Sequence, residues 1–164
     1  MILRKGLAMN RNLKQITQVG LGIAAVFCGT YFFIIPNQLG GYMNLGDGFI
    51  LLFASLVHPL GGFLIGGMGS AIADIVSGFG LYAPFTLVIK GLEGFIVAKY
   101  CHKINRYVCY LIGCFIMISG YFLVDWFLQG SFAIAITGLP TNLMQALCGM
   151  TIAVLLQRII RNVK

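Results

Sequence analysis

Long stretches of this chain contain no charged side chain, and they constrain the fold more than any other feature. Residues 15–46, 48–73, 107–124 and 126–157 lack aspartate, glutamate, lysine and arginine. A helix needs about 20 consecutive apolar residues to cross the hydrocarbon core of a bilayer. The sequence is 59% hydrophobic and only 9% charged, whereas soluble domains are about 25% charged. The chain is therefore predicted to be an all-α integral membrane protein.

Proline, glycine and polar residues divide these stretches into about six predicted spans. The spans are 15–35, 45–57, 60–78, 83–102, 106–129 and 139–161. Together they are expected to form a single transmembrane domain over residues 1–164. The second span is short, because a helix over 45–57 would rise only about 20 Å. Fusing it with the third would leave about five spans.

The basic residues decide between these two topologies. They form clusters at the edges of the apolar stretches: Arg4, Lys5, Arg11 and Lys14; Lys99, Lys103 and Arg106; and Arg158, Arg161 and Lys164. Lysine and arginine accumulate on the cytoplasmic side of membrane proteins. Only the six-helix topology puts every cluster on one side, so both termini are predicted to be cytoplasmic. The net charge of +7 thus reflects membrane topology, and no nucleic-acid partner is expected.

Several common functional motifs are missing from the sequence. It has no phosphate-binding loop, no HExxH, no GxSxG and no metal-ligand cluster. The five cysteines include no CxxC pair, and we expect buried, reduced thiols. The chain is therefore expected not to be an enzyme and to hold no cofactor or metal. Any energy for transport would come from a partner or an ion.

Ionisable residues inside the predicted spans are the first candidates for a functional site, because burying charge in a membrane is costly. They are Lys90 and all four acids of the sequence, Asp47, Asp74, Glu93 and Asp125. Apart from Glu93, which reaches the middle, they fall in the outer half of the predicted bundle. We interpret them as part of a ligand pocket that opens toward the outside.

Other polar and aromatic residues are predicted at the same level. Asn142 and Gln145 are three residues apart, so they share one face of a helix whose N-terminus favours an anionic or carbonyl-bearing ligand. Tyr42, Tyr82 and Trp126 add aromatic rings. One cation, several carboxylates, amides and rings suit a small, polar, planar ligand.

Each of these residues also has a structural interpretation. Lys90 and Glu93 could neutralise each other, and Asp47 could cap a helix. The remaining polar residues could join helices by hydrogen bonds, and the aromatic residues could belong to an interfacial belt. A shared pocket explains best why they all lie toward one side.

Small residues recur at helical spacing in two spans, which allows close helix packing. In the third span the repeat favours packing inside the bundle: Gly62, Gly66, Ser70 and Asp74. In the first span the pairs are Gly20 with Ala24 and Ala25 with Gly29. These pairs could pack inside the bundle or dock against a partner protein.

Several segments resemble one known family. The segments 41–48 (GYMNLGDG), 66–74 (GGMGSAIAD), 82–94 (YAPFTLVIKGLEG), 120–125 (GYFLVD) and 139–145 (LPTNLMQ) look like the S component of energy-coupling factor (ECF) vitamin transporters. The resemblance covers about residues 15–158. The segment 82–94 is similar to the branch that includes hydroxymethylpyrimidine-type S components.

The resemblance implies a six-helix S component without ATPase activity, in a bacterial-type plasma membrane. Such a chain would capture a water-soluble vitamin or precursor from outside, with hydroxymethylpyrimidine or a pyridoxine-like molecule as the expected ligand. The implied partners are a transmembrane T component and two ATPase subunits. The family docks through small residues of its first helix, and Gly20, Ala24, Ala25 and Gly29 match that pattern, with glycines where alanines are usual.

Two other functional classes remain as alternatives. A stand-alone secondary transporter or channel could use Lys90 and Glu93 as a proton relay. A membrane-embedded enzyme is a third possibility, but the sequence offers no nucleophile and base in a recognisable arrangement.

Overall fold

The computed structural model describes residues 11–162, which are mostly helical. After α1 (Arg11–Tyr31), the short strands β1 (Ile35–Pro36) and β2 (Tyr42–Met43) form an antiparallel hairpin with Ile35 opposite Met43. The remaining elements are α2 (Gly46–Ala54), α3 (Pro59–Val76), α4 (Ala83–Tyr100), α5 (Arg106–Gln129), α6 (Phe132–Ile136) and α7 (Leu139–Asn162). The basic residues Arg4, Lys5 and Lys164 lie outside the described residues.

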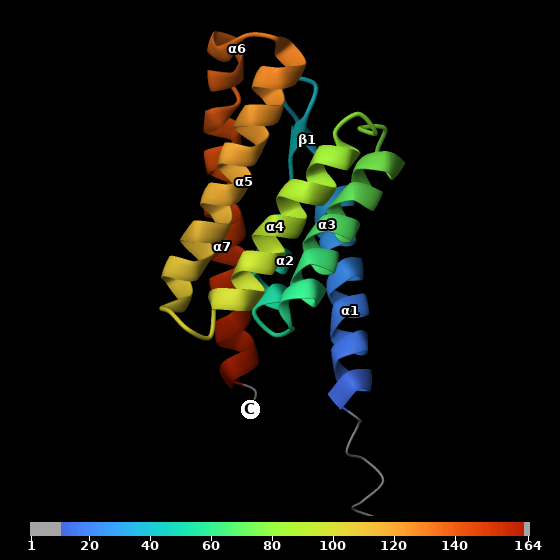
Figure 1. Cartoon of the computed structure of the whole chain (residues 1–164), viewed down its shortest axis with the longest axis vertical. Coiled ribbons are helices and arrows are strands. Elements are labelled where there is room, and N and C mark those ends of the chain that lie inside the picture. Colours follow the sequence, from blue (N-terminus) through green and yellow to red (C-terminus); the bar gives the residue numbers. More distant parts are fainter. Residues whose placement is uncertain (1–10, 163–164) are drawn as a thin grey trace, which may run out of the picture.

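The helices form a bundle with the hairpin at one end (Figure 1). Helices α1, α3 and α4 pack together on one side, and α5 and α7 pack together on the other. The short helix α2 contacts helices of both groups. The first described turn of α1 and the end of α7 lie at the same end of the bundle, opposite the hairpin (Figure 1).

A helix lies in each range that was predicted to be a span. Helix α5 coincides with 106–129, whereas α1 ends at Tyr31, before the expected position 35. The hairpin that follows α1 was not predicted, nor was α6, which Ser131 caps by accepting a hydrogen bond from the backbone N–H of Ile134. Helix α2 has only nine residues.

Local capping sets several helix boundaries. At the start of α3, Nδ1 of His58 accepts a hydrogen bond from the backbone N–H of Gly61 at 3.1 Å, and Pro59 follows in the first turn. At the end of α5, Gly130 adopts a left-handed conformation with φ of 64°, which glycine reaches without a steric penalty.

Three helical stretches of the described chain are long and apolar enough to cross a membrane. They are Pro59–Val76, Arg106–Gln129 and Phe132–Asn162. Helix α4 is as long as the first of these, but it carries Lys90, Glu93 and Lys99.

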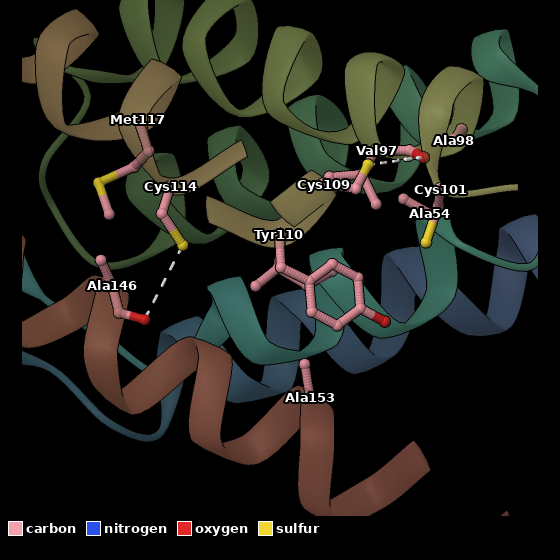
Figure 2. Close-up of a cluster of buried hydrophobic side chains, with 11 residues drawn as sticks. Ala54, Val97, Ala98, Cys101, Cys109, Tyr110, Cys114, Met117, Ala146 and Ala153 are labelled. Carbon is pink, nitrogen blue, oxygen red and sulfur yellow. Dashed lines mark hydrogen bonds between the residues drawn. The ribbon is translucent and has the colours of Figure 1, made fainter. Parts of the chain in front are cut away.

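The largest apolar cluster lies where α5 packs against α7, α2 and α4 (Figure 2). Tyr110 and Met117 of α5 are fully buried there, together with Leu51 of α2, Val97 of α4 and Ala153 of α7. This cluster joins the two sides of the bundle.

The cysteines are free thiols, and only some are buried. Cys109 and Cys114 belong to the apolar cluster, where Sγ of Cys114 lies 3.9 Å from the carbonyl oxygen of Ala146 (Figure 2). Cys28 is exposed on α1 and Cys148 is half-buried on α7. The expectation of burial is wrong for these two, because they lie on outward-facing parts of their helices.

Helices α3 and α4 approach each other backbone to backbone. A Cβ atom added at Gly66 would lie 2.1 Å from the carbonyl oxygen of Lys90, and one added at Gly62 would lie 2.3 Å from that of Gly94. The prediction that the small-residue repeat serves packing inside the bundle is confirmed for its glycines, Gly62 and Gly66. The contact fixes the height of Lys90 and Glu93 relative to α3.

Candidate ligand-binding site

A cavity lies at the hairpin end of the bundle, where α3 and α5 end and α4 and α7 begin. Its lining comes from these helices and from the hairpin segment, residues 32–45, and it is mostly polar: Asn37, Gly41, Tyr42, Asn44, Ser70, Asp74, Tyr82, Thr86, Tyr121, Asp125, Asn142 and Gln145. Most of the predicted ligand-binding residues are in this set, namely Tyr42, Asp74, Tyr82, Asp125, Asn142 and Gln145.

Lys90, Asp47 and Gln145 form a buried network beside the cavity. Nζ of Lys90 pairs with Oδ1 of Asp47, and Nε2 of Gln145 donates to Oδ2 of Asp47 at 2.6 Å. Oε1 of Gln145 accepts a hydrogen bond from the backbone N–H of Asn44 at 2.9 Å. Of these side chains, only Gln145 and Asn44 line the cavity. The Lys90–Asp47 pair therefore supports the cavity wall instead of lining it.

Glu93 lies deeper still. Its Oε2 is 3.7 Å from Nζ of Lys90, and neither carboxylate oxygen has a hydrogen-bond partner among the described residues. Lys90 therefore lies near two carboxylates, and Asp47 is closer to it than Glu93 is. The structural interpretation in which Lys90 and Glu93 neutralise only each other did not include Asp47. Lys90 also lies 5.5 Å from the ring centre of Tyr121, which lines the cavity.

Trp126 is not brought to the cavity. Its ring is 45% exposed and packs edge-on against Phe132 at 5.4 Å between ring centres. Successive helical residues point about 100° apart, so the inward direction of Asp125 turns its neighbour Trp126 outward.

Two tyrosine–aspartate pairs frame the cavity. The hydroxyl of Tyr42 donates to Oδ1 of Asp74, and the hydroxyl of Tyr82 lies 3.2 Å from Oδ1 of Asp125. Burial, and then the nearby Asp74 carboxylate, raises the pKa of Tyr42. Burial and the Asp125 carboxylate likewise raise the pKa of Tyr82. Both phenols therefore stay protonated and remain hydrogen-bond donors at neutral pH.

Two buried polar atoms on α3 have no partner among the described residues. They are Oγ of Ser70 and Oδ2 of Asp74, which lie one helical turn apart and both belong to cavity-lining residues. An unsatisfied buried acceptor costs about 1–3 kcal/mol. A ligand that donates hydrogen bonds to these atoms would remove that penalty.

The hairpin segment forms part of the cavity wall. Besides the Tyr42 and Asn44 contacts, the carbonyl oxygen of Leu39 accepts a hydrogen bond from Nε2 of Gln129 at 2.9 Å, and the Tyr82 hydroxyl lies 3.1 Å from the same oxygen. The cavity has a volume of about 20 Å³, and a single water needs about 10–15 Å³. A ligand larger than water therefore fits only if some of the lining side chains or the hairpin segment move.

Sequence reasoning missed several lining residues. Three of them lie one helical turn, four positions, before a predicted residue: Ser70 before Asp74, Thr86 before Lys90 and Tyr121 before Asp125. Extending each polar helix face by one turn would have found them. Asn37 and Asn44 lie in the hairpin segment, where helical periodicity carries no information.

The residues predicted to dock a partner differ in accessibility. Gly20 and Ala24 are exposed and Ala25 is half-buried. Gly29 is buried, and a Cβ added there would lie 2.6 Å from the ring of Phe49. Gly29 therefore packs against α2 inside the bundle and is not presented to a partner.

Comparison with known proteins identifies the family. Residues 10–162 match the family described as ECF-type riboflavin transporter, S component. The chain is 30% identical over 155 residues to the thiamine precursor transporter HmpT of Lactococcus lactis, with 93% of this chain and 91% of the relative covered. It is also 40% identical over 116 residues to an uncharacterised protein of Pyrococcus woesei, with 68% of this chain and 77% of the relative covered.

The family match covers all of the described residues, and it agrees with the helical fold and the apolar helices. S components are membrane-embedded subunits of transporters and not enzymes. The chain therefore belongs to the family of ECF-type riboflavin transporter S components.

Proposed function

We propose that this chain captures a small, planar, water-soluble vitamin precursor from outside the cell, as the substrate-binding S component of an ECF-type importer. The observation that carries the proposal is the polar cavity at the end of the bundle opposite the described chain ends. The HmpT relative is named a thiamine precursor transporter, which favours hydroxymethylpyrimidine as the ligand. A pyridoxine-like molecule has similar chemistry and is the second choice.

The hydrogen-bonding groups of the cavity suit such a ring. The free Oδ2 of Asp74 would accept from an exocyclic amino or hydroxyl group, and Ser70 would bond an adjacent ring atom. The amide of Asn142, in the first turn of α7, can both donate and accept. The ring of Tyr121 offers an apolar face to a planar ligand.

The proposed topology has about six spans, with both termini cytoplasmic and the hairpin outside. Its support is the distribution of charge: Lys99, Lys103 and Arg106 join α4 to α5 at the same end of the bundle as the end of α7. No lysine or arginine occurs in the hairpin segment 32–45 or in 130–138. The expected location is a bacterial-type plasma membrane.

The proposed partners are a transmembrane T component and two ATPase subunits. The family match supports them, and so does the absence of a phosphate-binding loop from this sequence. The exposed small residues Gly20 and Ala24 of α1 are our candidates for the docking surface, with Ala25 at its margin.

Binding of hydroxymethylpyrimidine to the purified chain, measured by isothermal titration calorimetry, tests the proposal. Asp74→Asn should weaken binding about ten-fold or more, because it removes a charged acceptor. Thr151→Ala is the matched control, since Thr151 is exposed on α7 and its hydroxyl bonds only the carbonyl oxygen of Leu147 among the described residues. Equal affinities of Asp74→Asn and the wild type would refute the assignment of this cavity.

A further inference from the structure

A second cavity, at the end of the bundle opposite the hairpin, is lined by arginines from two helices. It has a volume of about 640 Å³ and lies between the beginning of α5 and the end of α7. Its polar lining consists of Arg106, Tyr107, Gln157, Arg158, Arg161 and Asn162. Positive charge at this end is expected from membrane topology alone, but topology does not require that the charges converge on one cavity.

The arginine charges have no side-chain carboxylate to pair with. The sequence contains only four acids, and these are buried elsewhere, in or beside the polar cavity at the hairpin end. The ion pairs found among residues 11–162 both belong to Lys90. No acidic side chain therefore competes with an external anion for these arginines.

The beginning of α5 adds to the positive potential of this cavity. Asn105 caps the helix by accepting a hydrogen bond from the backbone N–H of Tyr107 at 2.9 Å, so the helix N-terminus opens beside Arg106. Helix N-termini attract phosphate. Guanidinium groups bind phosphate oxygens in pairs, with two parallel hydrogen bonds. The shared preference of these groups is for a phosphate-bearing anion.

The surroundings of the cavity distinguish a lipid from free phosphate. Exposed apolar side chains continue along both helices from the cavity toward the middle of the bundle: Val108 and Leu111 on α5, and Leu155 on α7. A phospholipid can place its phosphate on the arginines and its acyl chains along this apolar surface. Inorganic phosphate could contact only the arginines. We propose that the cavity binds the headgroup phosphate of an anionic phospholipid. Both leaflets of a bilayer contain phospholipid headgroups. The proposal therefore requires that the chain lies in a membrane, but not that this end faces the cytoplasm.

Native mass spectrometry of the purified, delipidated full-length chain tests this proposal. We expect phosphatidylglycerol to bind more tightly than phosphatidylcholine. The double variant Arg106→Gln/Arg158→Gln should weaken phosphatidylglycerol binding about ten-fold or more, because it removes two charged hydrogen-bond donors to the phosphate. The control Lys99→Gln/Lys103→Gln removes the same charge from the same end without touching the cavity lining. It removes no contact to the phosphate, so it should change binding less than about two-fold. Arg158→Gln alone, at an exposed position, is a milder variant if the double variant is unstable.

Three results would overturn the proposal. Equal losses in the arginine and lysine variants would mean a diffuse cationic surface. Equal binding of the two lipids would remove the role of the anionic headgroup. Binding of inorganic phosphate with the same dependence on the arginines, but no phosphatidylglycerol binding, would assign the cavity to free phosphate. Titration with hydroxymethylpyrimidine should give the same affinity in all variants, so failure here is separable from failure of the proposed transport function.

Discussion

At the scale of single residues, Lys90 lies between two buried carboxylates, and this position determines its role. It pairs with Asp47 and lies 3.7 Å from Glu93. Removing one member of a buried ion pair leaves an uncompensated charge, which is more costly than never having had the pair.

We therefore expect Lys90→Ala to lower the free energy of unfolding by about 3–5 kcal/mol. Adding Asp47→Asn should recover part of this loss, because it removes one of the stranded charges. Thermal unfolding in detergent, followed by circular dichroism, measures both effects. If Lys90→Ala unfolds at the wild-type temperature, the buried pair does not support the site.

Asn142 and Trp126 were both predicted to contact ligand, but only Asn142 lines the cavity. Asn142→Ala should weaken hydroxymethylpyrimidine binding about three- to ten-fold, the effect of one lost hydrogen bond. Trp126→Phe should leave the affinity unchanged, because the ring packs outside against Phe132. Calorimetric titration of the two variants side by side checks this, and a larger effect of Trp126→Phe would contradict the geometry.

The sequence predicted much of the site at this scale because charged and amide side chains inside apolar spans are conspicuous. The sequence could not distinguish residues that line the cavity from residues that support its wall. A charged side chain in a span is equally unusual whether or not it lines the cavity. Asp74 and Asp125 line it, whereas Lys90, Asp47 and Glu93 are buried beside it and contact one another. Which polar residues face a cavity depends on helix rotation and depth, and these are set by packing with other helices.

At the scale of elements, the glycines of α3 determine how closely α4 can approach. Gly66→Ala would put a methyl group 2.1 Å from the carbonyl oxygen of Lys90, so the helices would have to separate. We expect a loss of about 1–3 kcal/mol of stability, as for other overpacked positions, together with weaker ligand binding.

Gly20→Ala is the matched control for this substitution. Nothing lies within 4 Å of a Cβ added at Gly20, and alanine favours a helix over glycine by about 0.5–1 kcal/mol. Thermal unfolding should therefore show a lower midpoint for Gly66→Ala and an unchanged or higher one for Gly20→Ala. Equal midpoints for the two variants would mean that the close α3–α4 contact does not determine the effect of the substitution at Gly66.

The ranges of the long helices were predictable because their ends carry strong local signals. Asn105 and Gly130 bound α5, and Pro59 begins α3. The hairpin after α1 and the short helix α6 were not predicted, since each depends on a few local hydrogen bonds. The failure to predict the hairpin mattered most, because the hairpin segment supplies part of the cavity wall.

At the scale of the whole molecule, the chain is proposed to bind its ligand alone but to need partners for uptake. Ala24→Trp should reduce assembly with the T component and ATPase subunits, because it enlarges an exposed small residue of α1. It should leave ligand affinity unchanged. Leu123→Trp, at an exposed position of α5, is the control and should assemble normally. Co-purification of the subunits measures assembly, and normal assembly of Ala24→Trp would move the docking surface elsewhere.

Identification of the small molecule that co-purifies with the chain tests the central claim most directly. Mass spectrometry of extracts from the purified wild-type protein should find a planar nitrogen heterocycle with amino or hydroxyl substituents, and Asp74→Asn should lose it. The account would be contradicted if wild-type protein from cells supplied with hydroxymethylpyrimidine and pyridoxine carried neither, and if titration with each gave no binding.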